Sequence, residues 1–315
     1  MALRAVLLAL SAGLFPLAAG GAAAAPAAMP PIRHVFVLLL ENESYGVTFA
    51  AASPAPYLAH ELPRRGALLS NYFGIGHLSL GNYIALVSGQ APNEATQLDC
   101  PTFADFVAAS ARLGPQGQLP GTGCVYPRLV VTLADQLEAA GFTWRGYMED
   151  IGKDPARESG GCGHVPLGAP ETTTEATLSD QYAAKHNPFV YFHSIIDDPR
   201  RCAAHVVSLA HLSADLASVA TTANYSFITP NLCNDGHDVP CIDGRPGGFA
   251  AIDAFLRVWV PRIERSPAFR ADGMLVITFD ESDGAGPDGV SACCGEQALP
   301  GARYQPGLTG PGGGR

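Results

Sequence analysis

The sequence predicts an α/β domain built on a mostly parallel β-sheet. Apolar strand segments alternate with helical segments along the chain, which is the pattern of a parallel sheet covered by helices. The first strand, residues 32–40, is apolar almost throughout, as expected for a strand covered on both faces. At 315 residues the chain is long enough for one large domain or two small ones.

The other elements are predicted in chain order from apolar spacing and from start and stop signals. Strands are expected at residues 66–73, 142–148, 225–231 and 273–279, and helices at 56–65, 84–89, 132–141, 203–217 and 249–263. A threonine N-cap and a terminal glycine bound the helix at 132–141. Pro261 is expected to kink or end the last helix. Residues 189–192 fit either a short strand or a buried aromatic wall.

The first 28 residues have the composition of a signal peptide. Arg4 supplies the positive charge, residues 5–17 are apolar but too short to span a bilayer, and the alanine-rich run at 20–28 offers cleavage sites. An uncleaved membrane anchor is the alternative. We therefore expect a secreted or extracytoplasmic protein with no stable membrane insertion and with its catalytic domain at residues 29–315.

The charge balance excludes some classes of partner. The net charge is -10 and no basic stripe is present, which argues against nucleic acid. An acidic protein that handles an anionic substrate needs local positive charge in its site. A bound metal cation is one source of that charge.

The eight cysteines all follow the signal segment, and an even number in an exported chain favours disulfides. Cys233 and Cys241 bracket a short loop and form the best candidate pair. Cys293 and Cys294 are adjacent and are expected to bond to different partners. Zinc binding is the alternative, but the sequence contains no C-x-x-C pair.

Ser79 is predicted to lie in the turn that leads from the strand at 66–73 into the next helix. The N-terminus of a helix offers free N–H groups and the positive end of a dipole, which suit a phosphate. A hydroxyl there can attack, and the Asn82 amide can donate hydrogen bonds to developing negative charge. The alternative is a helix-capping serine followed by a buried asparagine.

Three acidic clusters follow predicted strand ends, at residues 41–42, 234–238 and 280–281. In open α/β sheets, ligand groups gather beyond the carboxyl ends of the strands. Carboxylate oxygens and an imidazole suit a divalent cation, which would lower the pKa of the serine and bind substrate oxygens. The alternatives are a solvated carboxylate at Glu41 and a disulfide-closed turn at 234–238.

Taken together, these motifs resemble the bacterial phosphoesterase family. The motifs are E-N-x-S-Y at 41–45, H-x-S-x-x-N-Y at 77–83, N-x-C-N-D-x-H-D at 231–238 and T-F-D-E at 278–281. That family includes secreted acid phosphatases and phospholipases C that hydrolyse phosphatidylcholine. Its fold is similar to that of the alkaline phosphatase superfamily, so the resemblance implies a three-layer sandwich.

The resemblance also implies roles for individual residues. The implied metal ligands are Glu41, Asn42, Asp235, His237, Asp280 and Glu281. Ser79 is implied as the nucleophile and Asn82 as a phosphate contact, although in phospholipase-C-like members the nucleophile lies elsewhere. His77 or His237 could protonate the leaving alcohol, and a structural role is the alternative for His77. The expected substrate is a small phosphate ester or a phospholipid.

The chain departs from the family pattern in two places. Gly81 stands where members usually have proline, which loosens the turn. Members normally continue with another strand and a histidine-bearing helix that helps to complete the metal site. This chain ends at Arg315, so we expect a C-terminal truncation.

Other functions fit parts of the sequence. The run from His77 to Gly81 is one residue away from the G-x-S-x-G elbow of α/β-hydrolases, and a carboxylesterase would use Ser79, an aspartate and a later histidine. That interpretation leaves Glu41 and Glu281 unexplained. A sulfatase is disfavoured because no proline lies two residues after Cys124. An inactive metal-binding remnant is a further alternative.

Overall fold

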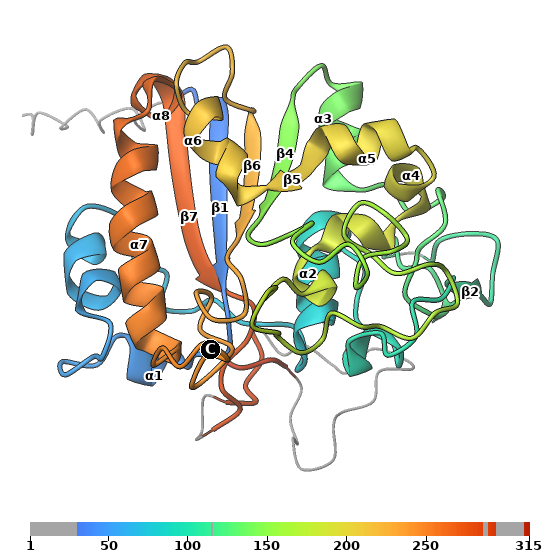
Figure 1. Ribbon diagram of the computed structural model, residues 1–315, viewed down its shortest axis with the longest axis horizontal. Coiled ribbons are helices and arrows are strands. Elements are labelled where there is room, and N and C mark those ends of the chain that lie inside the picture. The colour runs from blue at the N-terminus through green and yellow to red at the C-terminus, as the bar shows by residue number, and fades with distance from the viewer. Residues whose placement is uncertain (1–29, 115, 286–288, 294–311) are drawn as a thin grey trace, which may run out of the picture. The chain divides into compact units, whose positions relative to one another are not determined.

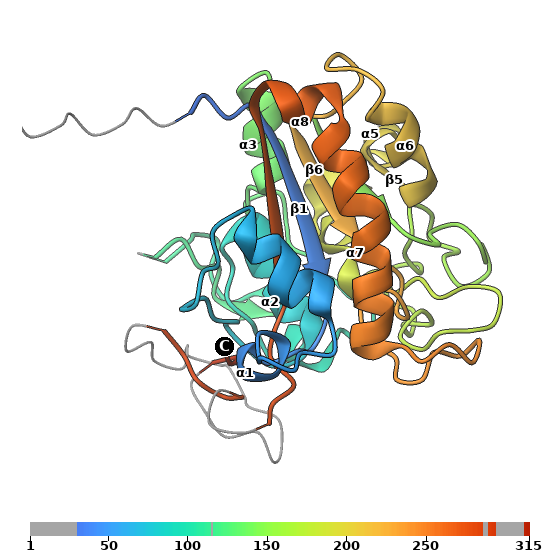
Figure 2. The same cartoon turned by 90° about the vertical axis from the view of Figure 1, so that its left-hand side faces the viewer.

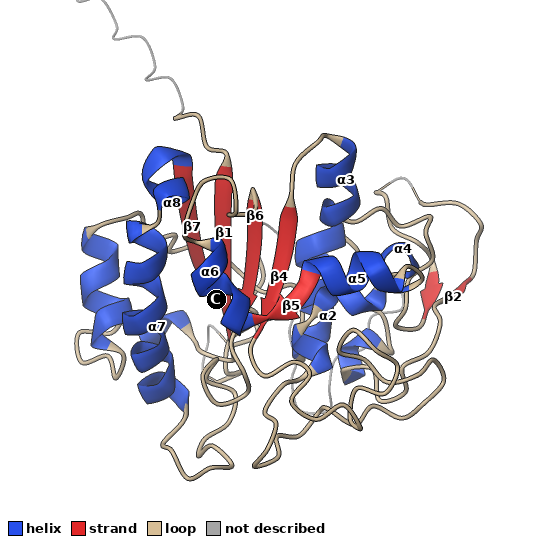
Figure 3. Cartoon of the chain, turned by 45° about the horizontal axis from the view of Figure 1, so that its top comes forward, coloured by secondary structure: helices blue, strands red, loops and turns tan. Residues whose placement is uncertain are grey.

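Within the described residues the central sheet has five parallel strands in the order β5-β4-β6-β1-β7, in agreement with the predicted α/β class. The strands are β1 (His34–Leu40), β4 (Trp144–Met148), β5 (Val206–Ser208), β6 (Tyr225–Thr229) and β7 (Gly273–Phe279) (Figure 3). This computed structural model describes residues 30–114, 116–285, 289–293 and 312–315. Residues 32–315 form one structural unit, to which the following description applies.

Alternate residues of β1 contribute to two separate cores, one on each face of the sheet. Phe36, Leu38 and Leu40 pack with α7 (Gly248–Arg265), whereas Leu39 packs with α2 (Ser79–Ser88). Because successive strand residues point to opposite faces, an unbroken apolar run can bury both faces at once. The predicted three-layer α/β sandwich is therefore confirmed (Figure 1).

Shorter helices complete the two outer layers. They are α1 (Tyr45–Thr48), α3 (Leu133–Ala139), α4 (His193–Ile196), α5 (Pro199–His205), α6 (Leu212–Asp215) and α8 (Pro267–Asp272). A two-stranded antiparallel ribbon is formed by β2 (Val107–Ala108) and β3 (Gly121–Thr122). Single 3₁₀ turns occur at Leu62–Arg64, Thr96–Leu98, Ala184–His186, Pro188–Tyr191 and Leu209–His211.

The start and stop signals of two helices act as predicted. Thr132 caps α3 and forms a reciprocal capping box with Asp135, in which each side chain bonds the other residue's backbone N–H. Gly89 ends α2 in the left-handed conformation, with φ of 68°. By contrast, α7 continues past Pro261 to Arg265, so the proline does not end that helix. Figure 2 shows α7 running along the sheet.

The helix predicted at residues 56–65 is present in an irregular form. A π-helical turn at Tyr57–Glu61 leads directly into a 3₁₀ turn at Leu62–Arg64. The N–H groups of Tyr57 and Leu58 donate to the Asp253 carboxylate of α7, at 2.7 and 3.2 Å. Since the first N–H groups of a helix lack partners within it, Asp253 acts as a cap supplied from a distant part of the chain.

The prediction of a strand at residues 66–73 is wrong. This segment is an exposed loop, and the Leu69 side chain is 68% accessible. The segment is apolar, as a strand would be, but a strand also needs a hydrogen-bonded neighbour. In the described sheet the strand next to β7 is β1, and none of the described strand pairs includes residues 66–73.

The single helix predicted at residues 203–217 is also wrong, because β5 interrupts it between α5 and α6. Val206 and Val207 are β-branched and pair with Gly146 and Tyr147 of β4, which outweighs the helical spacing of the leucines around them. Residues 189–192 are fully buried, and Pro188–Tyr191 form a 3₁₀ turn. The interpretation of residues 189–192 as an aromatic wall is the correct one.

Three disulfides within the described residues tie loops to this framework. They join Cys100 to Cys124, Cys162 to Cys202 and Cys233 to Cys241. The pairing of Cys233 with Cys241 is confirmed. Cys294 lies outside the described residues, so the expectation for Cys293 and Cys294 stays a prediction. In the part of the chain that the structure describes, no helix has both the length and the apolarity needed to cross a membrane.

Candidate functional site

Glu41 is the centre of a buried cluster at the carboxyl edge of the sheet. It directly follows β1, which lies between β6 and β7, so the residues that follow all three strands meet at this edge. The Glu41 side chain is 0% exposed. Ser79 donates a hydrogen bond from Oγ to Glu41 Oε2 at 2.8 Å, and the Tyr83 hydroxyl donates to Oε1. Both oxygens of one buried carboxylate are therefore held by α2.

His186 is the partner of Glu41 that sequence reasoning missed. Its Nδ1 lies 3.0 Å from Asp235 Oδ2, and its Nε2 lies 3.4 Å from Glu41 Oε2. One ligand atom from each of these three buried residues falls within 4.8 Å of the others, which is a spacing that can hold a metal ion. The His186 ring also stacks on Tyr83, with centroids 5.2 Å apart.

Two buried polar atoms in this cluster have no hydrogen-bond partner among the described residues: His186 Nε2 and Asp280 Oδ2. The contact from Nε2 to Glu41 is long and poorly aligned. Asp280 uses Oδ1 to accept the backbone N–H of Asn42 at 3.2 Å, which leaves Oδ2 without a donor. Buried polar atoms are rarely left unpaired, so these two are available to a bound cation.

The electrostatics of the cluster favour such a cation. Burial raises the pKa values of Glu41, Asp235 and Asp280, and the charges of Asp280 and Asp235 raise that of Glu41 further. Burial and the nearby charges of Lys185 and His237 hold the pKa of His186 well below its usual range. A neutral imidazole is the form that binds metals. The oxygen and nitrogen donors therefore fit a divalent cation.

Ser79 is the first residue of α2, as predicted, although a loop rather than a strand precedes it. The residue before it, Leu78, has φ of 67°, an uncommon conformation for a side chain of its size. The sharp turn at Leu78 directs the serine hydroxyl to Glu41 at the helix N-terminus. Ser79 is 2% exposed.

The side-chain amide of Asn82 forms hydrogen bonds with the loop that precedes Ser79. Its Oδ1 accepts the N–H groups of Ile75 and Gly76 at 2.9 and 3.2 Å, and its Nδ2 donates to Gly76 O at 2.8 Å. These bonds fix the loop from one turn further along α2. In this arrangement Asn82 has a supporting role, and its contact with a phosphate stays a prediction.

His77 and Glu281 form a second buried pair beside the cluster. His77 Nδ1 contacts the Glu281 carboxylate, and Nε2 lies 2.7 Å from Gly289 O. Burial raises the pKa of Glu281 to about 8. Burial opposes the charged form of His77, but the hydrogen bond and charge of Glu281 outweigh it and raise the pKa. Glu281 is thus engaged by His77 and lies outside the group of three potential ligands formed by Glu41, His186 and Asp235.

His237 lies at the more accessible rim of the site, with its side chain 26% exposed. Its backbone N–H donates to Asp235 Oδ1 at 2.8 Å, which holds that carboxylate in place. Its ring contacts Asp238 through Nδ1 at 2.9 Å and Lys185 through Nε2 at 3.1 Å. The structure therefore brings His237 close to the cluster, but both of its ring nitrogens have protein partners.

Asn42 has φ of 57° and a partly exposed side chain next to Glu41. Its backbone is bound to Asp280, as described above. A left-handed backbone is tolerated by asparagine better than by most residues. This conformation turns the chain sharply where β1 ends.

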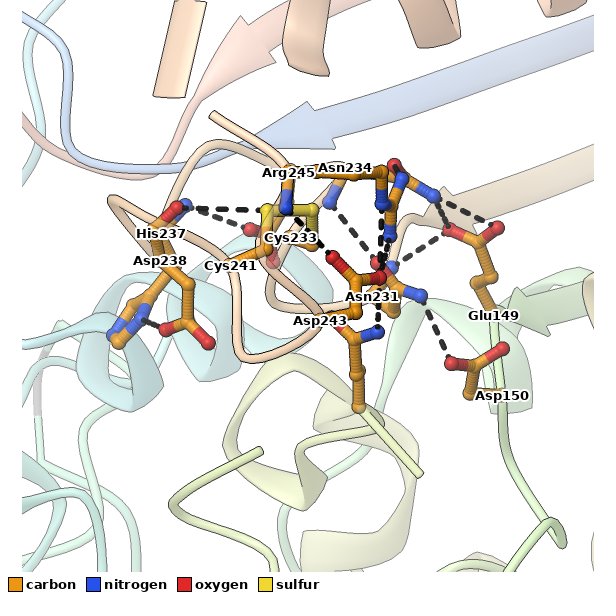
Figure 4. The surroundings of a disulfide bond; sticks show 12 residues. Glu149, Asp150, Asn231, Cys233, Asn234, His237, Asp238, Cys241, Asp243 and Arg245 are labelled. Atoms are coloured by element: carbon orange, nitrogen blue, oxygen red, sulfur yellow. Dashed lines mark hydrogen bonds and ion pairs between the residues drawn. A yellow bond between two sulfur atoms is a disulfide. The ribbon is translucent and has the colours of Figure 1, made fainter. Parts of the chain in front are cut away.

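The loop that carries Asp235 and His237 is held from two sides (Figure 4). The disulfide between Cys233 and Cys241 closes the loop, and Glu149 accepts two contacts from Asn234 Nδ2, at 3.0 and 2.9 Å. Glu149 directly follows β4 and was not predicted as part of the site. Asp243 also lies near the two sulfur atoms, but cysteines joined in a disulfide offer no thiolate to a metal.

A comparison with protein-family models supports the sequence resemblance. The model of the Phosphoesterase family matches residues 51–308, which include Ser79, Asp235 and Asp280 and leave Glu41 outside the matched range.

Curated relatives are similar over most of this chain. A probable acid phosphatase of Kluyveromyces lactis is 24% identical over 80% of this chain and 48% of its own length. A phosphate-repressible acid phosphatase of Penicillium chrysogenum is 29% identical over 71% and 43%. A phosphatidylinositol-3-phosphatase of Mycobacterium tuberculosis is 27% identical over 83% and 67%. The chain spans about half the length of the two fungal relatives.

Proposed function

We propose, because this chain belongs to the Phosphoesterase family, that it hydrolyses phosphate esters in the manner of an acid phosphatase. The names of the fungal relatives support this reaction. The observation that carries the proposal is the convergence of two carboxylates and a histidine around one serine hydroxyl. Glu41 receives the Ser79 hydrogen bond, and His186 links Glu41 to Asp235.

The residues expected to hold a divalent cation are Glu41, His186, Asp235 and Asp280. The unpaired Asp280 Oδ2 and His186 Nε2 support this donor set. When bound, a divalent cation supplies positive charge that lowers the pKa of a serine hydroxyl and neutralises phosphate oxygens. Asn42, His237 and Glu281 complete the set that the family resemblance implies.

In the proposed reaction, Ser79 Oγ attacks phosphorus and gives up its proton toward Glu41, its hydrogen-bond acceptor. The bond between phosphorus and the ester oxygen breaks, and the leaving alcohol takes a proton from His77, because His237 Nε2 accepts a hydrogen bond from Lys185. N–H groups at the start of α2 stabilise the non-bridging oxygens. The histidine then takes a proton from water as the water oxygen attacks the phosphoserine, inorganic phosphate is released, and Glu41 returns its proton to Ser79.

A phospholipid is the second candidate substrate. It is favoured by the similarity to the relative named phosphatidylinositol-3-phosphatase, which this chain covers over 67% of that protein's length. The structure argues against a Ser–His–Asp carboxylesterase. In such an enzyme the serine hydroxyl donates its hydrogen bond to a histidine, whereas Ser79 donates to Glu41. The three disulfides of the described residues and the signal-like N-terminus support an extracytoplasmic location for the enzyme.

The deciding experiment compares hydrolysis of p-nitrophenyl phosphate and p-nitrophenyl acetate by the purified protein. We expect phosphate ester hydrolysis that chelation abolishes and that a single added divalent metal restores. A Ser79→Ala variant, purified in parallel, controls for contaminating phosphatases. Full activity after exhaustive chelation would contradict metal dependence, and faster cleavage of the acetate would support the carboxylesterase.

A further inference from the structure

The chain contains only two lysines among its 19 lysine and arginine residues, and one of them is buried beside the site. Lys153 has a side chain that is 57% exposed, whereas that of Lys185 is 7% exposed. Arginine supplies nearly all other positive charge in this chain. A buried lysine is therefore unusual here, and it indicates a position that requires a small, concentrated ammonium charge.

Two contacts hold the Lys185 ammonium in place. Its Nζ lies 3.2 Å from Asp99 Oδ2 and 3.1 Å from His237 Nε2. The other oxygen of Asp99 accepts the backbone N–H of Leu80 at 2.9 Å, and Leu80 directly follows Ser79. One carboxylate thus connects the lysine to the first turn of the helix that presents the serine.

The geometry leaves Lys185 with capacity for a ligand. An ammonium group has three N–H donors, and the described residues accept two of them, at Asp99 and His237. His237 is the accessible member of this group, while Ser79 is nearly inaccessible. Lys185 therefore connects His237, at the more exposed rim, with Asp99, which binds the backbone of the residue after Ser79.

The charges of the site explain why an ammonium is needed there. Glu41, Asp235 and Asp280 are buried carboxylates, and they repel an incoming phosphate. The positive charge of a single divalent cation does not balance the negative charge of three carboxylates and a phosphate dianion. Lys185 adds a fixed positive charge near these carboxylates, where it is held next to Asp99 and His237.

We propose that Lys185 binds a non-bridging oxygen of the substrate phosphate and thereby favours phosphomonoesters over phosphodiesters. This inference rests on the proposed phosphoesterase function. A monoester carries up to two negative charges on three non-bridging oxygens, and a diester carries one charge on two. The ammonium consequently contributes more to binding the monoester, because the attraction between charges grows with the charge of each partner.

The first test replaces the lysine and measures both classes of ester. In Lys185→Met, kcat/KM for p-nitrophenyl phosphate should fall by roughly 10- to 100-fold, as for the loss of a charged hydrogen bond. The value for bis(p-nitrophenyl) phosphate should fall several-fold less. Lys185→Arg should restore part of the preference, and Lys153→Met is the matched control, with no expected change. Equal losses for both esters would overturn the proposal.

A second variant, Asp99→Asn, is expected to raise the affinity for phosphate, whereas Lys185→Met is expected to lower it. Asp99→Asn keeps an oxygen for the Leu80 N–H but removes the negative charge beside Lys185. Titration calorimetry with inorganic phosphate, on both metal-free and metal-loaded protein, should show several-fold tighter binding to this variant and weaker binding to Lys185→Met. If the ion pair serves only the fold, Asp99→Asn should weaken phosphate binding, which would overturn the proposal even if Lys185→Met does not fold.

The phosphate titration also separates this inference from the proposed function. A wild-type protein that binds phosphate but cleaves neither ester would contradict the enzymatic function and leave the two binding measurements to decide the role of Lys185. A wild-type protein that cleaves both esters while Asp99→Asn binds phosphate less tightly would retain the function and reject the inference.

Discussion

The Tyr83 hydroxyl donates a hydrogen bond to Glu41, although 42 positions separate the two residues in the sequence. Ser79 lies four positions before Tyr83, so both side chains project from the same face of α2. The helix thus holds each oxygen of Glu41 with a separate hydroxyl group. This relationship couples the orientation of a proposed metal ligand to the packing of α2.

Removing that hydroxyl should weaken metal binding. In Tyr83→Phe the ring still stacks on His186, but Glu41 Oε1 loses its donor. We expect metal affinity to fall by about 10- to 100-fold, the range found when a residue that orients a ligand is changed. Titration calorimetry with a divalent metal measures this, and Tyr72→Phe, at an exposed position, is the control. Unchanged affinity would separate Tyr83 from the metal site.

Ser79→Ala should abolish most turnover while metal affinity remains. A hydroxyl is a poor nucleophile at its ordinary pKa, so its place against Glu41 and the proposed cation is what makes attack feasible. Acid quenching of the wild-type protein during turnover should trap phosphate on the peptide that contains Ser79. Phosphate recovered on a different residue would move the nucleophile and leave Ser79 as the start of a helix.

Asn82→Ala separates the supporting role of this residue from a direct role in catalysis. The substitution leaves the N–H groups of Ile75 and Gly76 without their acceptor, so the free energy of unfolding should fall by about 2–4 kcal/mol. A residue that only contacts the phosphate would instead cost ~10²–10³ in rate and leave stability unchanged. Denaturant titration and kcat, measured on the same preparation, distinguish the two results.

Replacing Cys233 and Cys241 together with serine should affect the site more than the fold. The disulfide closes a loop of so few residues that its removal costs on the order of 2–3 kcal/mol in the chain-entropy model. Asp235 and His237 lie inside that loop, so metal affinity should decrease measurably in protein that still unfolds cooperatively. The Cys100 and Cys124 double substitution is the control, since the segment that this bridge closes contains no proposed metal ligand. Equal metal affinity in both variants would argue against this role.

The sequence predicts β1, β4, β6 and β7 because their apolar runs are local signals, but it misses β5. The apolar run of β1 and the acidic residues that follow it can be recognised without any partner, and the same holds for β6 and β7. Residues 66–73 have comparable apolar content but no strand to pair with. The sequence also places Ser79 at the entrance to this helix and Gly89 at its end, although the predicted helix, 84–89, starts five residues later than α2.

The residues that were missed depend on contacts that no local pattern records. His186 belongs to a short 3₁₀ turn in a stretch without helical or strand periodicity, and only the folded chain brings it to Glu41 and Asp235. Lysine is rare in this sequence, and this rarity is the one sequence feature that could have marked Lys185 as a candidate functional residue. Asp99 gave none, because its contacts with Leu80 and Lys185 join three separate segments.

The position of β1 within the sheet has a consequence for the order of events during synthesis. Its partners, β6 and β7, begin at Tyr225 and Gly273, so the most apolar strand is made first and acquires its neighbours last. At ~5–20 residues per second, a ribosome needs roughly 10–40 s to make the chain from β1 to β6. Throughout that interval the β1 segment is an unpaired apolar strand that is prone to aggregation. Aggregation of the nascent chain therefore has to be prevented until almost all of the sheet has been synthesised.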